Sequence, residues 1–381
     1  MTSPPTTLLP KTMRAWLVNR AGPPSPTTLQ LQTIPAPSPS PFPPTGTNIL
    51  VKISHAALNP VDLHLINTLP TWLPFRRRPP FAPAFDFSGE VAALGPAVPE
   101  SLGISVGTPI CGALNLAQIV AGRGTLAEYL VCDAHLVAVK PEGVTSAQAA
   151  GLMGIAGQTT ALMVGFAGVK AGQRALVNGA SGGVGSILVQ ALSGKGLTVY
   201  GVCSAGNDGL VKRLGAVETV DYTRGELEVL LKERFGKKQE EEEDQRLDFI
   251  FDCAGSQALF SHSEGYLKEK GRFISIVGGP SQGVVPYVRN KLRPVFLGGV
   301  PRAYDLLLLL PSGKTATQIA QWVSEGVVRE AVVDSEFEME DVIKVSFIPY
   351  WVVTNLLLTR GQAYEKLGSK HAKGKVIVKV S

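Results

Sequence analysis

Short apolar runs separated by turn-forming residues fill the first part of the chain. Three of them, residues 49–53, 89–94 and 127–131, alternate with segments rich in proline, glycine and β-branched residues. Apolar runs of this length, bounded by turn signals, are typical of strands rather than helices. Residues 1–145 are therefore predicted to form a compact β domain with many turns.

From residue 146 the pattern changes to alternating helices and strands. After a first helix come strand 175–178, helix 186–193, strand 198–202, helix 209–214 and strands 249–253 and 273–277. Such alternation is what βαβ units with a parallel sheet require. The predicted fold class is therefore α/β, with a doubly wound parallel sheet in residues 146–300. The charged run KKQEEEEDQR at 237–246 is predicted to be a solvated loop extension.

The first strand of this second region runs directly into a glycine-rich turn. Residues 176–185 read LVNGASGGVG, and an apolar helix pattern follows. In a dinucleotide-binding turn the first glycine takes backbone angles closed to other residues, the second lets the main chain approach a pyrophosphate, and the third lets helix and strand pack tightly. The strand before the turn and the helix after it favour such a site over a chance match. The three glycines are Gly179, Gly182 and Gly185, and the residues expected at the pyrophosphate are Ser181, Gly182, Gly183 and Val184.

The second strand, 198–202, indicates which nicotinamide nucleotide would bind. A site that prefers NAD usually has an Asp or Glu about 20 residues after the turn, where the carboxylate binds the ribose hydroxyls. This chain has the sequence VCS there. With no carboxylate to repel a 2′-phosphate, NADPH is the expected cofactor, and Ser204 and Tyr222 are expected to contact that phosphate. The nearby cations Lys212 and Arg213 are each better interpreted as solvated helix residues.

Composition and charge narrow the class of protein. With 381 residues, 45% of them hydrophobic, and a mean hydropathy of +0.16, the chain is long enough for two cores and is typical of a globular protein. A net charge of +5 without a basic, aromatic-rich patch does not indicate a nucleic-acid partner. No apolar stretch is long enough to predict a membrane span.

Cysteine spacing and the N-terminal residues indicate a compartment. The four cysteines are far apart and none forms a CxxC pair, so neither a disulfide framework nor a four-cysteine zinc site is expected. The first residues lack the long apolar core of a signal peptide and the arginines of a transit helix. A reducing, cytosolic setting is expected, and only a family resemblance would favour mitochondria.

Several ordered motifs resemble the medium-chain dehydrogenase/reductase superfamily. They are ALNPVDLHL at 57–65, FDFSGEVAALG at 85–95, GTLAEYLV at 124–131, GQTTALM at 157–163, NGASGGVG at 178–185, VCSAGNDGLVKRLGAVETVDY at 202–222 and KGKVIVKV at 373–380. They span nearly the whole chain and are most similar to the zinc-free quinone oxidoreductase-like members, in particular the reticulon-interacting branch. The resemblance implies a GroES-like domain at 1–145, a Rossmann domain at 146–300 and a C-terminal segment at 301–381 that returns to the first domain.

Two departures from the zinc-dependent members of that superfamily predict the absence of a metal. Where zinc alcohol dehydrogenases carry a cysteine ligand this chain has Asn59, and where they carry Gly-His-Glu it has Phe85, Asp86 and Phe87. Without thiolate or imidazole there is no soft ligand set for zinc. In the zinc-free relatives an asparagine contacts the nicotinamide side of the cofactor, and the resemblance assigns that role to Asn59.

A quinone or an α,β-unsaturated carbonyl is the expected hydride acceptor. Hydride transfer from NADPH needs orientation and a place for the developing enolate charge more than it needs an acid. One or two neutral hydrogen bonds, at about 3 kcal/mol each, supply that place. A proton-donating His64 and a structural, partly buried His64 are equally good interpretations, and Asp62 is expected to brace the loop after Pro60 rather than act as a base. The candidate catalytic residues, expected at a cleft between the domains, are Asn59, Asp62, His64 and Thr159.

Two other functions stay open from the sequence. A trans-acting enoyl reductase of a polyketide pathway would need a wide apolar cleft and a docking surface. A non-catalytic NADPH-binding regulatory module would bind the nucleotide without turnover. Neither the identity of the substrate nor a homodimer, which is common in the family that this chain resembles, is determined by the sequence.

One segment, residues 345–362, matches none of these motifs. It reads VSFIPYWVVTNLLLTRGQ, and its proline would break a helix that the flanking residues otherwise predict. When the 18 residues are removed, Val342, Ile343, Tyr364 and Leu367 fall at i, i+1, i+4 and i+7 on one helix face. The codons of such a segment can contain the signals of an intron. Those for Val-Ser can form a splice donor, those for Thr-Asn a branch point, those for the leucine run a pyrimidine tract, and that for the final Gln a splice acceptor. The segment is therefore interpreted as a translated intron, with a membrane-dipping segment and a substrate-gating loop as alternatives.

Overall fold

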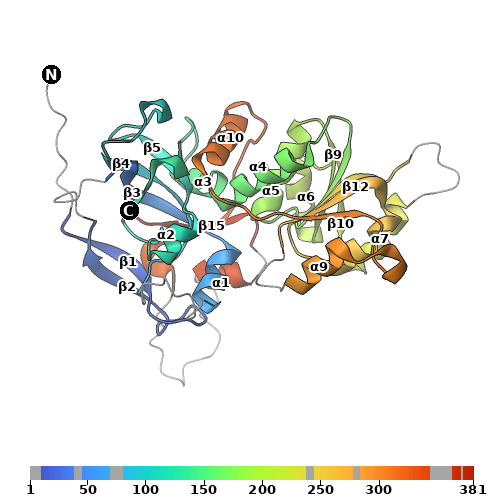
Figure 1. Ribbon diagram of the computed structural model, residues 1–381, viewed down its shortest axis with the longest axis horizontal. Helices are drawn as coiled ribbons and strands as arrows, with labels where there is room; N and C mark the ends of the chain where they lie inside the picture. Colours follow the sequence, from blue (N-terminus) through green and yellow to red (C-terminus); the bar gives the residue numbers. More distant parts are fainter. Residues whose placement is uncertain are drawn as a thin grey trace. The chain divides into compact units, whose positions relative to one another are not determined.

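The computed structural model describes residues 10–37, 45–68, 80–236, 244–277, 284–343, 363–369 and 372–381. In it the chain divides into two units, both visible in Figure 1. Unit 1 contains Met1–Gln158, Leu310–Ala320 and Val333–Ser381, and unit 2 contains Thr159–Leu309 and Gln321–Val332.

Unit 1 is built on two sheets. The strands β1 (Thr12–Val18) and β2 (Leu29–Pro35) form an antiparallel ribbon. The larger sheet has seven strands, which are β3 (Asn48–Leu58), β4 (Asp86–Leu94), β5 (Pro109–Ala113), β6 (Tyr129–Asp133), β7 (Val137–Val139), β14 (Val333–Glu338) and β15 (Lys375–Lys379). Its order is β14-β15-β3-β4-β5-β7, and β6 also pairs with β3. The last strand of the chain, β15, therefore lies inside the sheet, parallel to β14 and antiparallel to β3.

Short helices close unit 1. They are α1 (Pro60–Thr68), α2 (Leu116–Val120), α3 (Ser146–Leu152), α11 (Ala363–Gly368) and α10 (Gly313–Ser324), which continues into unit 2, together with the 3-10 turns η1 (Glu100–Leu102), η2 (Ala134–Leu136) and η7 (Met339–Asp341). Helix α3 begins at a capping box formed by Thr145 and Gln148. Its Ala150 packs against Ala57 and Ile377 of the large sheet, so α3 is part of unit 1.

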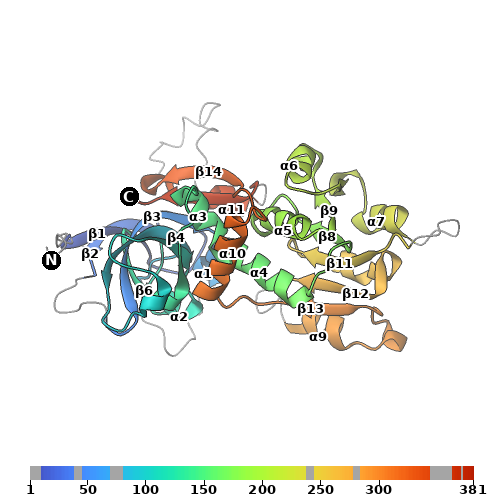
Figure 2. The same ribbon diagram turned by 90° about the horizontal axis from the view of Figure 1, so that it is seen from above.

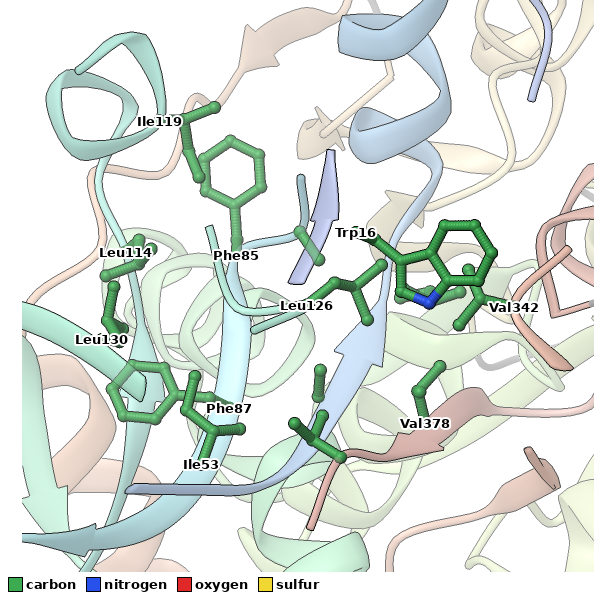
Figure 3. Close-up of a cluster of buried hydrophobic side chains, with 14 of the residues drawn as sticks. Trp16, Ile53, Phe85, Phe87, Leu114, Ile119, Leu126, Leu130, Val342 and Val378 are labelled. Atoms are coloured by element: carbon green, nitrogen blue, oxygen red, sulfur yellow. The ribbon is translucent and has the colours of Figure 1, made fainter. Parts of the chain in front are cut away.

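The core of unit 1 collects alternate residues of its strands, because side chains two apart on a strand face the same side. On β3, Ile49, Val51 and Ile53 are all buried. Figure 3 shows this cluster, in which Trp16 of β1 and Val342, just after η7, both take part. The Trp16 indole Nε1 also donates to the Met339 carbonyl at 2.7 Å. The first strand is thus fixed to the chain that precedes residue 344.

Unit 2 contains one parallel sheet of six strands. They are β8 (Arg174–Asn178), β9 (Thr198–Cys203), β10 (Glu218–Asp221), β11 (Leu247–Asp252), β12 (Leu267–Ser275) and β13 (Ala303–Leu306). The order β10-β9-β8-β11-β12-β13 corresponds to 3-2-1-4-5-6 within the unit. This is the order of dinucleotide-binding sheets, in which ligands bind where the order reverses, here at the carboxyl ends of β8 and β11. The predicted α/β fold with a doubly wound parallel sheet is confirmed.

Helices connect these strands, as Figure 2 shows for α5 beside β8 and β9. The helices are α4 (Ile155–Ala167, which starts in unit 1), α5 (Gly183–Gly194), α6 (Asp208–Arg213), α7 (Leu227–Phe235), α8 (Gln257–Ser261) and α9 (Val284–Leu292), with 3-10 turns η3 (Ala205–Asn207), η4 (Tyr222–Arg224), η5 (Ser263–Gly265) and η6 (Val295–Leu297). In the described part of the chain no single helix is long and apolar enough to cross a membrane, and only the bent pair α3 and α4 meets that test jointly.

The strands predicted at 175–178, 198–202 and 249–253 coincide with β8, β9 and β11 to within two residues. Strand β10 was not predicted, because Glu218–Asp221 is short and has only one apolar residue, Val220. Unit 1 continues to Gln158, beyond the boundary predicted at 145, because α3 packs on its sheet. The insert 345–362 and residues 237–243 of the charged run lie outside the described residues.

Candidate functional site

The glycine-rich turn joins the end of β8 to the start of α5. Gly179 has a φ of +78°, a left-handed conformation that glycine adopts without strain. Gly182 is the residue before α5, and a Cβ there would lie 3.3 Å from the Gly179 carbonyl oxygen. A Cβ at Gly185 would lie only 2.1 Å from the same oxygen. The backbone therefore has the geometry predicted for the three glycines.

Helix α5 presents its first amides at the carboxyl end of β8. The turn residues Ser181, Gly182, Gly183 and Val184 are partly exposed, whereas the helix is buried from Gly185 to Leu192. The first amides of a helix have no acceptor within the helix, and no side chain caps the N-terminus of α5. With the positive end of the helix dipole behind them, these amides can bind the oxygens of a pyrophosphate.

Asn207, the last residue of η3, links the glycine turn to the residue that follows β9. Its Nδ2 donates to the Ser181 hydroxyl at 3.1 Å and to the Ser204 hydroxyl at 3.2 Å. Its Oδ1 is buried without a protein partner, a state that usually costs about 1–3 kcal/mol. The sequence analysis missed Asn207, although an asparagine three residues after Ser204 has the spacing for a side chain to return to the same loop.

The two residues predicted to contact a 2′-phosphate follow neighbouring parallel strands. Ser204 is partly buried after β9, and Tyr222 is 49% exposed after β10. Lys212 forms an ion pair with Asp208 at 2.9 Å, and Arg213 forms one with Glu330 at 2.9 Å. Pairing with carboxylates agrees with the interpretation of both cations as helix surface residues.

A carboxylate also ends strand β10. Asp221 lies opposite Cys203 in the sheet register, accepts a hydrogen bond from the Thr223 amide at 3.0 Å and lies 3.5 Å from Arg224. The sequence analysis considered only the end of β9 and missed Asp221.

In unit 1, Asn59 and Asp62 form a reciprocal cap at the start of α1. Pro60 is the first residue of this helix, where the missing N–H is tolerated. The backbone N–H of Asp62 donates to the backbone carbonyl of Asn59 at 2.9 Å, and the backbone N–H of Asn59 donates to Asp62 Oδ2 at 2.7 Å. This is the kind of bracing contact that the sequence predicts for Asp62.

The Asn59 side chain belongs to a buried polar cluster with Asp86 and Lys375. Lys375 Nζ donates to Asn59 Oδ1 at 2.6 Å and to Asp86 Oδ2 at 3.0 Å, and Asn59 Nδ2 donates to Asp86 Oδ2 at 2.8 Å. The other carboxylate oxygen of Asp86 accepts from the Ile155 amide at the start of α4, at 2.8 Å. Burial raises the pKa of Asp86, and the ammonium of Lys375 opposes that rise.

Two oxygens beside this cluster have no hydrogen-bond partner among the residues that the structure describes. They are Asp62 Oδ1 and the Tyr364 hydroxyl, both buried. Burial raises the pKa of Asp62 to about 8, against the hydrogen bond from Asn59. Burial also raises the pKa of Tyr364, and the negative charge of Asp62 adds to the rise. Burial therefore favours the protonated form of both side chains.

The raised pKa of Asp62 predicts a pH-dependent stability. The folded protein holds the Asp62 proton up to pH about 8, whereas an unfolded aspartate releases it near pH 4. Between those values folding takes up a proton, so this residue lowers the free energy of unfolding by at most about 1.4 kcal/mol for each pH unit of increase. Asp62→Asn keeps an acceptor for the backbone N–H of Asn59, but the new side chain does not titrate. We expect Asp62→Asn to gain stability relative to wild type as pH rises from 5 to 8.

Urea unfolding at four pH values in that range measures this difference. The exposed Asp341 provides the control, since Asp341→Asn is expected to follow the wild-type curve. Parallel curves for wild type and Asp62→Asn would show that Asp62 is already ionised in the folded protein.

The remaining candidates do not join this cluster. His64 is exposed on α1 rather than buried, and Thr159 is 5% exposed within the part of α4 that belongs to unit 2. The sequence analysis missed the roles of Asp86, Lys375 and Tyr364. The one sequence signal for Lys375 is its place directly before the apolar residues VIV, which predict a buried strand. A lysine in such a strand predicts a buried partner of opposite charge, because charged residues are rarely buried without one.

No metal-binding group is apparent in this part of the molecule. Across residues 10–37, 45–68, 80–236, 244–277, 284–343, 363–369 and 372–381, no three His, Cys, Asp or Glu side chains are grouped so that they could hold a metal ion. The four cysteines are free thiols, and burial raises the pKa of Cys111 and Cys132 to about 12.

Comparison with known proteins finds relatives along the whole chain. The alcohol dehydrogenase GroES-like domain matches residues 45–142, and the zinc-binding dehydrogenase domain matches residues 214–344. A medium chain reductase from Acremonium sp. is 33% identical, covering 97% of this chain and 99% of the relative. A trans-enoyl reductase from Penicillium oxalicum is 29% identical, covering 97% and 98%. The structure of the quinone oxidoreductase from Coxiella burnetii has a TM-score of 0.75 at 24% identity, covering 97% and 100%.

Proposed function

We infer that this chain, which belongs to the zinc-free, quinone oxidoreductase-like members of the medium-chain dehydrogenase/reductase superfamily, is an NADPH-dependent reductase. The proposed reaction transfers hydride to a quinone or to an α,β-unsaturated carbonyl compound. Unit 1 is the GroES-like unit of such a protein and unit 2 is the Rossmann unit. That the chain is an oxidoreductase follows from its relatives, and the coenzyme and the acceptor are what we propose.

The observation that carries the proposal is the uncapped N-terminus of α5 beside a glycine turn, combined with a serine at the end of β9. The amides of Ser181, Gly182, Gly183 and Val184 suit a pyrophosphate. Ser204, held by Asn207, offers a hydroxyl rather than a carboxylate where a ribose would lie. The carboxylates near the end of β9 are paired with cations, Asp221 with Arg224 and Asp208 with Lys212.

The bound nicotinamide would supply the hydride, and the chain would orient it and accommodate the charge that develops on the acceptor oxygen. We assign the orienting role to Asn59, together with the neutral carboxyl of Asp62, with His64 and Thr159 as the other candidates. Neutral donors suffice, because one positioned hydrogen bond to the developing oxyanion contributes about 3 kcal/mol. The enolate or hydroquinone anion that hydride transfer leaves would then take its proton from water, so no strong acid is needed.

A second candidate function is a trans-acting enoyl reductase of a polyketide pathway. The likeness to a trans-enoyl reductase over nearly the whole length of both chains favours it. The chemistry would be the same hydride transfer, and the difference would lie in an acceptor carried by another protein. A non-catalytic NADPH-binding module is the third reading.

The proposal includes a homodimer in a reducing, cytosolic compartment. Large apolar side chains are exposed on and after α9 and around β13, at one edge of the unit 2 sheet, and a second copy could cover them. They are Val288, Leu292, Val295, Phe296, Leu297 and Leu308. The four free thiols agree with a reducing compartment.

Turnover of reduced nucleotide with a panel of quinones beside a panel of short enones tests the function. We expect oxidation of NADPH with at least one panel, no loss of rate on treatment with a zinc chelator, and a mass of two chains by light scattering of the same sample. Tight NADPH binding without turnover would favour the non-catalytic module. Turnover only with a carrier-bound enoyl acceptor would favour the enoyl reductase.

Ser204→Ala tests the coenzyme assignment. Removing a hydrogen bond to a charged group costs about 1.5–3 kcal/mol, so we expect the Kd for NADPH to rise about tenfold or more. The Kd for NADH is expected to change less than about twofold, because that nucleotide lacks the 2′-phosphate. Ser261→Ala, at an exposed hydroxyl of unit 2, is the control. Equal effects on the two nucleotides would place the 2′-phosphate elsewhere.

A further inference from the structure

Asn59, Asp86 and Lys375 close a ring of three hydrogen bonds. The ammonium binds Asn59 Oδ1 at 2.6 Å and Asp86 Oδ2 at 3.0 Å, and Asn59 Nδ2 returns to the same Asp86 oxygen at 2.8 Å. A lysine can only donate and a carboxylate can only accept. The ring therefore fixes which end of the Asn59 amide faces Lys375 and which faces Asp86.

The ring buries two charged groups, whose loss of hydration opposes folding. The Lys375 side chain is 4% exposed and that of Asp86 is 0% exposed. Taking an ammonium and a carboxylate out of water costs several kcal/mol for each ion, and apolar residues of similar volume are often as stable. The three residues come from the end of β3, the start of β4 and the start of β15, so the chain brings distant segments together to build the ring.

The amide of Asn59 is left with one weakly used donor. One Nδ2 hydrogen is committed to Asp86 at 2.8 Å, while the contact with the Ala57 carbonyl is long, at 3.4 Å. The ammonium on Asn59 Oδ1 draws electron density from the amide, which makes its N–H groups stronger donors, as in other polarised hydrogen-bond chains. A carbonyl oxygen of a ligand could accept a hydrogen bond from this N–H, which is already oriented.

We propose that Lys375 is a positioning residue for the reduction, which fixes and polarises the Asn59 amide through direct contact with its oxygen. The proposal rests on the function proposed above, because it gives Asn59 a role toward the nicotinamide or the acceptor oxygen. Asp86 accepts hydrogen bonds from Lys375 and from Nδ2 of the Asn59 side chain. The backbone N–H of Ile155 in turn donates to Asp86 and fixes the carboxylate. Lys375 itself need not touch the substrate.

Steady-state kinetics of Lys375→Met with NADPH and the best acceptor tests this role. We expect kcat to fall about 10- to 100-fold, as when an outer residue that orients a functional group is removed, while the KM for NADPH changes less than about twofold. Lys379→Met is the matched control. Lys379 lies four residues along the same strand, where it pairs with the exposed Glu338 at 3.5 Å, and we expect its replacement to leave kcat unchanged.

A double variant separates positioning from stability. Lys375→Met alone leaves a buried carboxylate without its cation and is expected to be less stable. Asp86→Asn in the same chain removes that charge, so we expect stability to recover and kcat to stay low. Recovery of kcat together with stability would overturn the proposal, since it would mean that the ion pair serves the fold alone.

The Asn59 amide can also be followed without turnover. In protein labelled with ¹⁵N-asparagine, we expect the side-chain amide protons of Asn59 to exchange slowly in wild type and in Lys379→Met, and at least about tenfold faster in the double variant. Unchanged exchange in the double variant would overturn the positioning role even if the enzyme is active. Absence of turnover in wild type, with the expected exchange, would instead contradict the proposed function and leave the positioning of Asn59 intact.

Discussion

Gly185→Ala is expected to destabilise unit 2 by about 3 kcal/mol or more and to abolish nucleotide binding. The added Cβ would lie 2.1 Å from the Gly179 carbonyl oxygen, 2.8 Å from the Gly179 carbonyl carbon and 2.9 Å from the Ala180 Cα. All three atoms are backbone of the turn, so no side chain can move aside. Overpacking in a rigid core costs about 1–3 kcal/mol and sometimes more. Urea unfolding and calorimetric titration with NADPH measure the two effects.

Gly182→Ala is the matched control, because it lies in the same turn but its Cβ would meet one backbone atom closely instead of overlapping three. Its φ is −81°, which suits any residue, and the added Cβ would lie 3.3 Å from the Gly179 oxygen. We expect this variant to unfold within about 1 kcal/mol of wild type while its affinity for NADPH falls, because the methyl group stands between the turn and a pyrophosphate. A Gly185→Ala protein that binds NADPH like wild type would contradict the proposed site.

Removal of residues 345–362 is expected to stabilise the protein. The residues on either side, Val342, Ile343, Ala363 and Tyr364, are all buried in one core cluster with Trp16. An 18-residue connection between these two ends costs about 2–3 kcal/mol more in chain-closure entropy than a direct join. Joined directly, the flanking residues would continue one amphipathic helix from Met339 through Leu367. We expect the midpoint of thermal unfolding to rise by roughly 5–10 °C, measured by circular dichroism.

Two outcomes of the same deletion would contradict the interpretation of residues 345–362 as a translated intron. If the shortened chain does not fold, or folds and loses NADPH turnover that the full chain has, then the segment belongs to the functional protein. Removing only residues 345–353 is the control, since it leaves a loop and is expected to gain little. The match to the zinc-binding dehydrogenase domain ends at residue 344, directly before the segment. Sequencing mature transcripts decides the intron interpretation independently, and it is wrong if every message retains these codons.

Part of unit 2 could be predicted from the sequence because the signals there are local. An apolar run, three spaced glycines and an apolar helix pattern fix β8, the turn and α5 without knowledge of the rest of the chain. The prediction failed for β10 and β13, because a strand of four residues carries little signal of its own, and β10 has only one apolar residue. Asp221 was missed with it, and so was the charge that it brings beside Ser204.

The polar cluster of unit 1 could not be predicted because it is assembled from distant segments. Lys375 and Asp86 are 289 residues apart in the chain and become neighbours only when β15 pairs with β3 beside β4. The sequence identified Asn59 and Asp62 from a local motif, but it could not show that both ends of the Asn59 amide would be engaged. Tyr364 was considered only as a helix-face residue, and its unpartnered hydroxyl depends on burial that the pattern does not reveal.

The position of β15 inside its sheet has a consequence for how the protein is made. All of unit 2 has been synthesised once residue 332 emerges, whereas unit 1 lacks an internal strand until residues 375–379 leave the ribosome. During translation the Rossmann unit can therefore complete its core first, while β3 and β14 each keep an unpaired edge that is prone to aggregation. A stop codon before residue 372 would accordingly remove β15 from the middle of the sheet, and with it Lys375, the residue that anchors Asn59.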